Sequence, residues 1–142
     1  LAGYLNFYFH LIFKNVTLVQ SAAGEIFDQM LRIGPGDVLV GISFPRYSQI
    51  AVNAVRFARD RGADVIAVTD SKMSPIYKMA SASLLVSSDM ISFVDSMAAP
   101  VSLLNALIMA VGQQKSEETA ESFSELERVW SQYGVFGDAE DE

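Results

Sequence analysis

Residues 37–70 read DVLVGISFPRYSQIAVNAVRFARDRGADVIAVTD, and this stretch decides the fold. It begins and ends with two almost wholly apolar runs, 37–43 and 63–70, of the kind that forms strands buried on both faces of a parallel sheet. Between them, residues 49–61 carry apolar side chains at helical spacing, and Gly62 closes the helix. A strand, a helix and a second strand predict a right-handed βαβ unit and therefore an α/β fold.

The rest of the chain continues this alternation. We expect further helices at 1–14, 23–34, 74–79, 95–113 and 117–133, and further strands at 16–20 and 83–87. Ser74 and Pro75 are suited to the N-cap and first position of the short helix, and Pro100 to the first turn of the long helix or to a kink in it. The pattern predicts a three-layer α/β domain, with helices on both faces of a parallel sheet.

Length and composition fit one globular domain. The chain has 142 residues, of which 51% are hydrophobic, enough for a sizeable core. Cysteine is absent, which excludes a disulfide framework, a thiolate zinc site and a cysteine nucleophile, and fits a reducing cytoplasm. No uninterrupted apolar run is long enough to span a membrane, and the apolar N-terminal segment lacks the basic start of a signal peptide.

The net charge of −7 comes from the C-terminal segment. Nine of the 17 acidic residues lie at or beyond Glu117, where Arg128 is the one basic residue. An acidic segment repels nucleic acid and anionic membranes, so this chain is not expected to contact DNA directly. Residues 137–142, GDAEDE, are expected to form a solvated acidic tail that follows a domain at 1–136.

The loop GISFPRYSQ (41–49) joins the first strand of the βαβ unit to its helix. Such loops bind anions, because free backbone N–H groups and the positive end of the helix dipole point into them. Ser43, Tyr47 and Ser48 add hydroxyl groups, and Arg46 adds a positive charge with bidentate geometry for phosphate. The alternative is that Ser48 merely caps the helix while Arg46 is solvated, and local chemistry does not decide between the two.

Known nucleotide motifs are missing from this loop. It has no GK[ST] sequence of a Walker motif and no G-x-G-x-x-G of a dinucleotide site. A phosphate site without a nucleotide motif indicates a smaller phosphorylated ligand. We expect no cofactor and no metal site.

The run from Asp37 to Ser88 resembles a sugar isomerase (SIS) domain. The shared features are a strand followed by a serine-containing loop, a helix ending in A-x-x-x-G-A (here ARDRGA), a strand ending in Thr-Asp, and the pattern Ser-Pro-Leu-x-x-x-Ala-Asp (here SPIYKMAS). The ISFPRYS loop, the helix SFVDSMAAPVSLLNALI and the final segment ELERVWSQYGVF resemble the RpiR/MurR-type transcriptional regulators. This resemblance covers about residues 1–136 and implies a flavodoxin-like sheet.

The resemblance implies ligand-binding residues position by position. Ser43 matches the first serine of the family's phosphate-binding loop, and Ser48 matches its final Ser/Thr. Phe44 and Arg46 lie in the same loop, where Arg46 replaces the usual glycine and Pro45 replaces a second serine. The loop before the long helix implicates two more residues, Asp95 and Ser96. The predicted ligand-binding set is therefore Ser43, Phe44, Arg46, Tyr47, Ser48, Asp95 and Ser96.

The family's sheet normally begins with a central strand that precedes the helix resembling residues 1–14. Leu1 lies inside that helix, so we expect that the first strand and half of the phosphate site are missing from the chain. We also expect that the strand at 16–20 cannot easily pair with the strand at 37–43.

The resemblance implies a phosphosugar-sensing domain of a bacterial-type transcriptional regulator, without catalytic residues. It would bind a phosphorylated sugar or amino sugar, form a cytoplasmic homodimer or tetramer through its long helix and the helix of Trp130, and reach DNA only through a helix-turn-helix domain absent from this chain. The first alternative is an aldose–ketose phosphosugar isomerase, for which the candidate bases are His10, Asp70, Asp89 and Asp95. The second alternative is a dimerisation domain whose ligand site has decayed.

Overall fold

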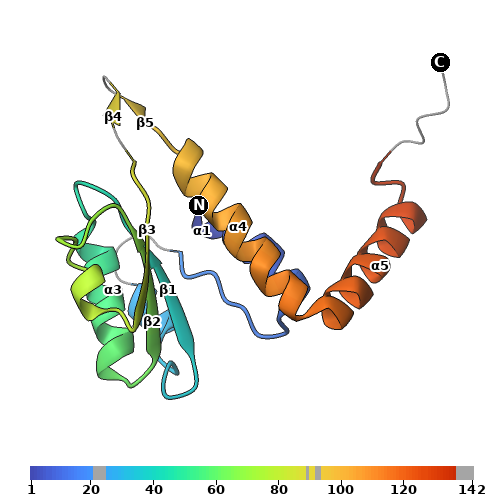
Figure 1. Cartoon of the computed structure of the whole chain (residues 1–142). Helices are drawn as coiled ribbons and strands as arrows, with labels where there is room; N and C mark the ends of the chain where they lie inside the picture. Colours follow the sequence, from blue (N-terminus) through green and yellow to red (C-terminus); the bar gives the residue numbers. More distant parts are fainter. Residues whose placement is uncertain (21–24, 89, 92–93, 137–142) are drawn as a thin grey trace. The chain divides into compact units, whose positions relative to one another are not determined.

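The computed structural model describes residues 1–20, 25–88, 90–91 and 94–136. The chain divides into two compact units, of which the first comprises Leu1–Ala2 and Leu18–Leu104. The second comprises Gly3–Thr17 and Asn105–Glu142. Figure 1 traces both along the chain, and the expected tail at 137–142 lies outside the described residues.

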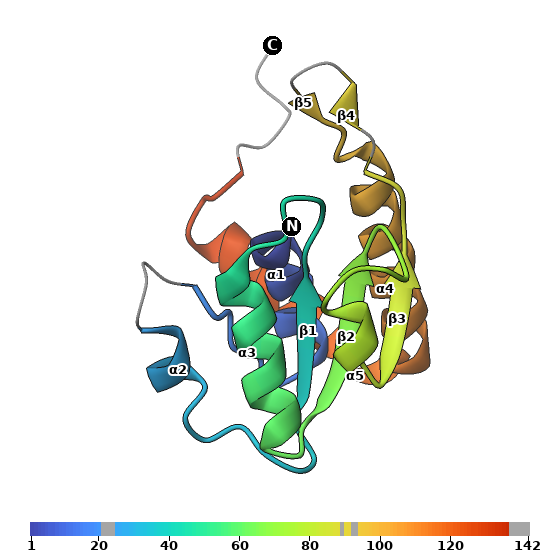
Figure 2. The same cartoon turned by 90° about the vertical axis from the view of Figure 1, so that its left-hand side faces the viewer.

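The first unit contains a parallel sheet of three strands, in the order β1 (Val38–Ile42), β2 (Asp64–Thr69) and β3 (Ala82–Leu85). Gly41 lies opposite Ala67, which lies opposite Ser83, so all three strands end at the same edge. Figure 2 shows them side by side. The apolar runs of the sequence therefore form strands as predicted, with ends that differ by one or two residues.

Helix α3 (Gln49–Asp60) covers one face of this sheet (Figure 2). Its apolar side chains, including the fully buried Val55, pack with Val65 and Ala67 of β2 in one hydrophobic cluster. Burial of a valine of this kind contributes about 1.5–2 kcal/mol. Val68 points to the opposite face of the sheet and is also fully buried, so that face is covered as well. The α/β architecture, a parallel sheet flanked by helices, is confirmed.

Several short elements differ from the sequence predictions. Residues 16–20 form no strand, because even β-branched residues need a neighbouring strand with which to form hydrogen bonds. Val19 nevertheless packs against the hydrophobic cluster. The helix predicted at 23–34 is a single turn, α2 (Ile26–Gln29), and residues 21–24 lie outside the described part of the chain. The short helix predicted at 74–79 is a 3-10 turn at Tyr77–Met79 that Ser74 does not cap.

The long apolar helix begins later than predicted. Two short strands, β4 (Met90–Ile91) and β5 (Val94–Asp95), form an antiparallel hairpin before it. Helix α4 (Ala98–Gln114) follows, with Pro100 in its first turn as expected. Proline fits there because an N–H group in the first turn has no acceptor within the helix, so the lack of this group in proline costs no hydrogen bond.

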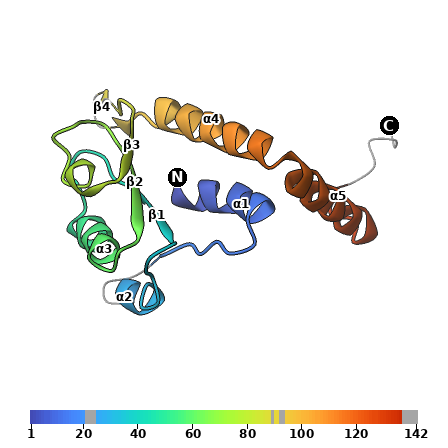
Figure 3. The ribbon, with the colours of Figure 1, turned by 60° about the horizontal axis from the view of Figure 1, so that its bottom comes forward.

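The second unit is helical. It consists of α1 (Ala2–Ile12) from Gly3 onward, the part of α4 from Asn105 onward, and α5 (Ser116–Gln132). The Tyr4 hydroxyl donates a hydrogen bond to Asn105 and so links α1 to α4. Figure 3 shows α5 directly after α4, and Lys115 is the one residue between the two helices. In the described residues, no helix has both the length and the apolar character required to cross a bilayer.

Candidate functional site

The site is built on the loop Ser43–Ser48, which leaves the carboxyl end of β1 and enters α3. In open parallel sheets, ligands bind at this edge, where loops and helix N-termini meet. The loops after β2 and β3 begin at the same edge of the sheet. The chain therefore places its predicted anion-binding loop where the fold supports a ligand.

Ser43 is held by its backbone. Its N–H group donates to the Val68 carbonyl oxygen at 3.1 Å, and its own carbonyl accepts from the Thr69 hydroxyl at 2.7 Å. Thr69 is fully buried and Ser43 is 7% exposed. Because both backbone groups of Ser43 are engaged with β2, a ligand in the loop would meet this residue through its side chain.

Ser48 is the N-cap of α3, as predicted, with an extended backbone before the first turn. Its side-chain oxygen accepts from the Ala51 N–H group at 3.5 Å, which is long for a hydrogen bond. The N–H groups of Gln49 and Ile50 belong to the first turn, where the helix itself offers no acceptor. The start of α3 is therefore a weakly capped set of donors to which an anion can bind.

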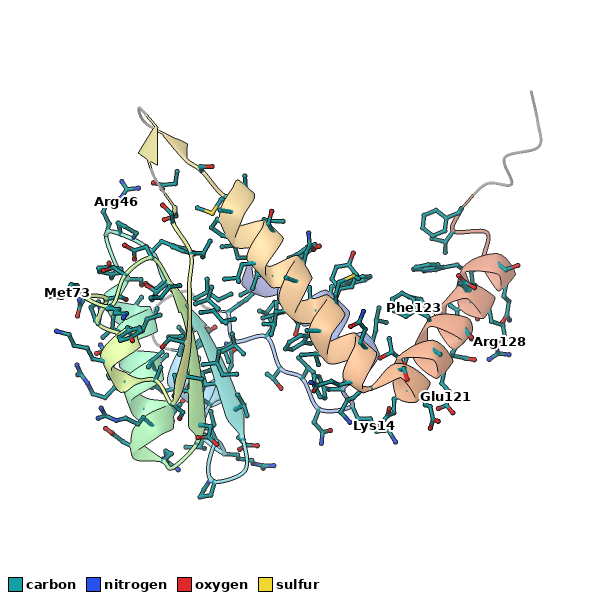
Figure 4. The ribbon with its side chains drawn as sticks, in the orientation of Figure 1. Lys14, Arg46, Met73, Glu121, Phe123 and Arg128 are labelled. Carbon is teal, nitrogen blue, oxygen red and sulfur yellow. The ribbon has the colours of Figure 1, made fainter. Side chains whose placement is uncertain are left out.

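Arg46 adopts a strained backbone, with φ of 68°. This left-handed conformation favours glycine and costs a side-chain-bearing residue about 1–2 kcal/mol. Its guanidinium group lies 3.3 Å from a carboxylate oxygen of Asp95 on β5. Figure 4 labels Arg46 in the loop next to the β4–β5 hairpin. Arg46 thus has a partner on the same chain, and the pair is too exposed to stabilise the fold strongly.

Tyr47 joins the loop to the end of β2. Its hydroxyl donates to Asp70 at 2.9 Å, and the same carboxylate accepts from Thr69 at 3.3 Å. Burial, followed by this hydrogen bond and the negative charge of Asp70, raises the pKa of Tyr47 above its ordinary value of 10.0. Tyr47 therefore stays protonated and donates to Asp70 at neutral pH.

The sequence offers Asp70 only as a candidate base for an isomerase, whereas in the structure it accepts hydrogen bonds from Tyr47 and Thr69 and so joins the serine loop to the end of β2. The signal that could have identified it is its position in Thr69-Asp70, directly after a buried strand next to the serine loop in the sheet. Ser74, which follows in the same connection, is fully buried, and its hydroxyl has no hydrogen-bond partner among the described residues. The predicted ligand-binding set includes neither the Thr69–Asp70 pair nor Ser74, which the structure places next to the loop.

The structure brings together part of the predicted set. Ser43 and Tyr47 are connected through Thr69 and Asp70, and Arg46 meets Asp95, as the hydrogen bonds above show. Phe44 is half-buried in the loop, and Ser96 is half-buried between β5 and α4. Their roles in ligand binding stay predictions.

Groups for metal binding or proton transfer are sparse near the loop. In the described ranges, no three histidine or acidic side chains gather in a way that could hold a metal ion. The Asp70 carboxylate accepts from Tyr47, and the Asp95 carboxylate faces Arg46. His10 is exposed on α1 in the second unit. Asp89, the remaining candidate base, lies outside the described residues.

The fold and the candidate site define an α/β domain whose parallel sheet ends in a serine-containing loop at a helix N-terminus. Residues 1–110 match the family model of the SIS domain, so the chain belongs to the SIS domain family. The resemblance inferred from residues 37–88 is confirmed.

Known relatives extend this assignment. The chain is 30% identical over 100 residues to an uncharacterized HTH-type transcriptional regulator from Caldanaerobacter subterraneus subsp. tengcongensis. The match covers 68% of this chain and 36% of the relative, so the chain spans about a third of the relative's length.

Three solved structures share the fold. The sugar isomerase domain of an RpiR transcription factor from Sphaerobacter thermophilus has a TM-score of 0.83 at 22% identity, covering 89% of this chain and 71% of that one. The Vibrio vulnificus NanR protein complexed with ManNAc-6P has a TM-score of 0.72 at 15% identity, covering 96% and 52%. A putative phosphosugar isomerase from Bacillus subtilis has a TM-score of 0.59 at 21% identity, covering 79% and 34%.

Proposed function

We propose that this chain is the phosphosugar-sensing domain of a cytoplasmic transcriptional regulator. It binds a sugar phosphate or amino-sugar phosphate in the Ser43–Ser48 loop, and it passes the bound state to a helix-turn-helix domain elsewhere in the protein. The curated relative, an HTH-type regulator, supports the regulatory part of this proposal. The NanR structure, whose bound ManNAc-6P is a phosphorylated amino sugar, supports the ligand class.

The observation that carries the proposal is the weakly capped start of α3. A phosphate at this position would accept hydrogen bonds from the first N–H groups of α3 and from the Ser43 and Ser48 hydroxyls. Because the hydrogen bond from the Ala51 N–H group to the Ser48 oxygen is long, a better acceptor can easily replace this cap. The hydrogen bonds from Thr69 to Ser43 and from Tyr47 to Asp70 hold the loop in place before the ligand arrives, which lowers the entropic cost of binding.

Transmission of the bound state needs contacts between subunits, and the second unit offers an apolar surface for them. A groove of about 460 Å³ is lined by residues of α1, α4 and α5, among them Tyr8, Ile12, Ile108, Met109, Gly112 and Phe123. Phe123, labelled in Figure 4, is 39% exposed, and Met109 is 64% exposed. Helix α5 has no buried residue in the single chain. We propose that this surface forms a homodimer contact through α4 and α5, the apolar long helix and the helix of Trp130 for which the sequence predicts that role.

The rival proposal is a phosphosugar isomerase, which the fold shared with the Bacillus subtilis protein keeps open. Isomerisation needs a base that reaches the proton beside the sugar carbonyl. The two described carboxylates nearest the loop, Asp70 and Asp95, face hydrogen-bond donors of this chain. A sensor that binds without turnover accounts for this arrangement more simply.

The test is calorimetric titration with a panel of hexose 6-phosphates and amino-sugar 6-phosphates that includes N-acetylmannosamine 6-phosphate. We expect one of them to bind, and we expect Ser43→Ala and Ser48→Ala each to weaken binding by about tenfold, the value of one charge-assisted hydrogen bond. Ser102→Ala, at an exposed position of α4, is the matched control and should bind as the wild type does. Conversion of a bound aldose phosphate to its ketose, followed by NMR, would establish the isomerase instead.

A further inference from the structure

Arg46, the positively charged residue of the proposed anion-binding loop, forms an ion pair with Asp95 of the same chain. The two residues are 49 positions apart in sequence, and the guanidinium–carboxylate distance is 3.3 Å. Their side chains are 77% and 40% exposed, so both are open to solvent and to a ligand. The inference drawn from this pair rests on the proposal that the loop is a phosphate site.

We propose that Asp95 is an internal competitor for Arg46 and thereby sets the affinity and charge selectivity of the loop. A ligand that uses Arg46 must take the guanidinium group from Asp95. A phosphate monoester carries nearly two negative charges at neutral pH and attracts the guanidinium more strongly than one carboxylate does. A neutral sugar has no group that can replace the carboxylate. The competition therefore favours phosphorylated over unphosphorylated ligands.

Arg46 combines a left-handed backbone with a side-chain contact to another element. Its φ is 68°, and its guanidinium group contacts Asp95 on β5. The free-energy cost of the left-handed backbone does not depend on which group the side chain contacts. The side chain can therefore change its partner while the backbone stays in place. The pair then acts as a switch with two alternative acceptors for one guanidinium group.

Asp95 also connects this switch to α4 along the chain. It is the last residue of β5, and Ser96 and Met97 separate it from the first residue of α4, Ala98. Loss of the Arg46 contact therefore frees the hairpin at the point where it leads into the helix. Occupancy of the loop and the state of the hairpin become linked, as a sensor requires.

The experiment measures the affinity of the full chain for inorganic phosphate by calorimetry at low ionic strength. An exposed ion pair changes an equilibrium constant by up to about fivefold. We therefore expect Asp95→Asn to tighten phosphate binding about two- to fivefold. In an Arg46→Gln background, the same Asp95→Asn change should have no effect, because the contested group is gone. The control Asp60→Asn removes the same charge from a comparable exposed pair, Arg59–Asp60 (2.7 Å), and should leave binding unchanged.

The outcomes separate this inference from the proposed function. Phosphate binding that Ser43→Ala abolishes but Asp95→Asn fails to tighten would overturn the competitor and leave the phosphate site intact. Equal tightening with and without Arg46 would also overturn it, since that result reflects net charge alone. Absence of phosphate binding in both the wild type and Asp95→Asn would overturn both proposals together. Hydrogen exchange in the absence of ligand provides a second measurement, in which Arg46→Gln should speed exchange at β5 and unchanged exchange would contradict the link to the hairpin.

Discussion

The position of α3 on β1 depends on Gly41, and replacement of this glycine by alanine tests the packing behind the site. A Cβ atom at Gly41 would lie 2.7 Å from the Cγ2 atom of Val55, whereas ordinary contacts begin near 3.4 Å. Val55 is 1% exposed and β-branched, so it has little freedom to turn away. Overpacking of this kind costs about 1–3 kcal/mol, which alanine offsets by about 0.5–1 kcal/mol through lower chain entropy.

We therefore expect Gly41→Ala to lower the free energy of unfolding by about 1–2 kcal/mol. In urea titrations this loss moves the midpoint without changing the slope, and in thermal melts it lowers Tm by about 2–4 °C per kcal/mol. Val55→Ala alone should cost about 2–3 kcal/mol, from two lost methyl groups and the remaining cavity. Because Val55→Ala also makes room for the new Cβ atom, Gly41→Ala should cost less than about 0.5 kcal/mol in that background.

Gly34→Ala is the matched control for this cycle. Its Cβ atom would lie 3.9 Å from the nearest neighbour, an ordinary contact, so the change should be neutral within about 0.5 kcal/mol. A Gly41→Ala variant as stable as the wild type would refute the close approach of α3 to β1. The same conclusion would follow if the cost were equal with Val55 present and absent.

Three further variants test the contacts that hold the loop. Thr69→Val keeps the side-chain shape but leaves the buried Ser43 carbonyl without its hydrogen-bond donor. The free energy of unfolding, measured by urea titration, should therefore fall by about 1–3 kcal/mol. An unchanged urea midpoint would contradict this hydrogen bond. Tyr47→Phe removes a group whose pKa is raised by burial and by Asp70; its contribution to stability is present below about pH 10 and is lost as pH rises through the raised pKa. The stability difference between wild type and Tyr47→Phe should therefore shrink as pH rises above about 10, as followed by urea titration at each pH, and a constant difference would count against the assignment. Ser48→Ala should cost less than about 1 kcal/mol, because its bond to the helix is long, while it weakens phosphate binding; a large stability loss with unchanged binding would show that Ser48 is a cap alone.

The βαβ core could be predicted because its patterns are strong and local. Residues 37–70 contain two buried apolar runs, an amphipathic helix with an N-cap serine and a closing glycine, and the structure follows them closely. Ser48 caps α3 as expected, and Gly62 has the positive φ, 83°, that ends the helix. Local propensity, capping and burial all favour the same structure here.

The marginal elements could not be predicted, because tertiary contacts decide them. Residues 16–20 have the composition of a strand, but a strand requires hydrogen bonds from a neighbour. The sequence pattern predicted a helix from Asp95 onward, whereas Asp95 belongs to the short strand β5. A two-residue strand leaves almost no periodicity in a sequence, so it could not be recognised. The same limit applies to the single turn of α2.

The site could be predicted only in part for the same reason. The position of Ser43 and Ser48 relative to the strand and the helix follows from the order of the elements. The contact of Arg46 with Asp95 and the hydrogen bond from Tyr47 to Asp70 join residues that are distant in sequence, so no local pattern indicates them. Asp95 was predicted to bind the ligand; the structure adds its contact with Arg46, and its role in ligand binding stays a prediction.

The most direct test of the central claim follows backbone amide signals of the full chain by NMR during addition of the sugar phosphate that binds most tightly. If phosphate binds at the start of α3, the amide signals of Gln49, Ile50 and Ala51 should shift most, and Ser43→Ala should need about tenfold more ligand to produce the same shifts. Shifts confined to other parts of the chain, with the α3 amides unchanged, would contradict the account.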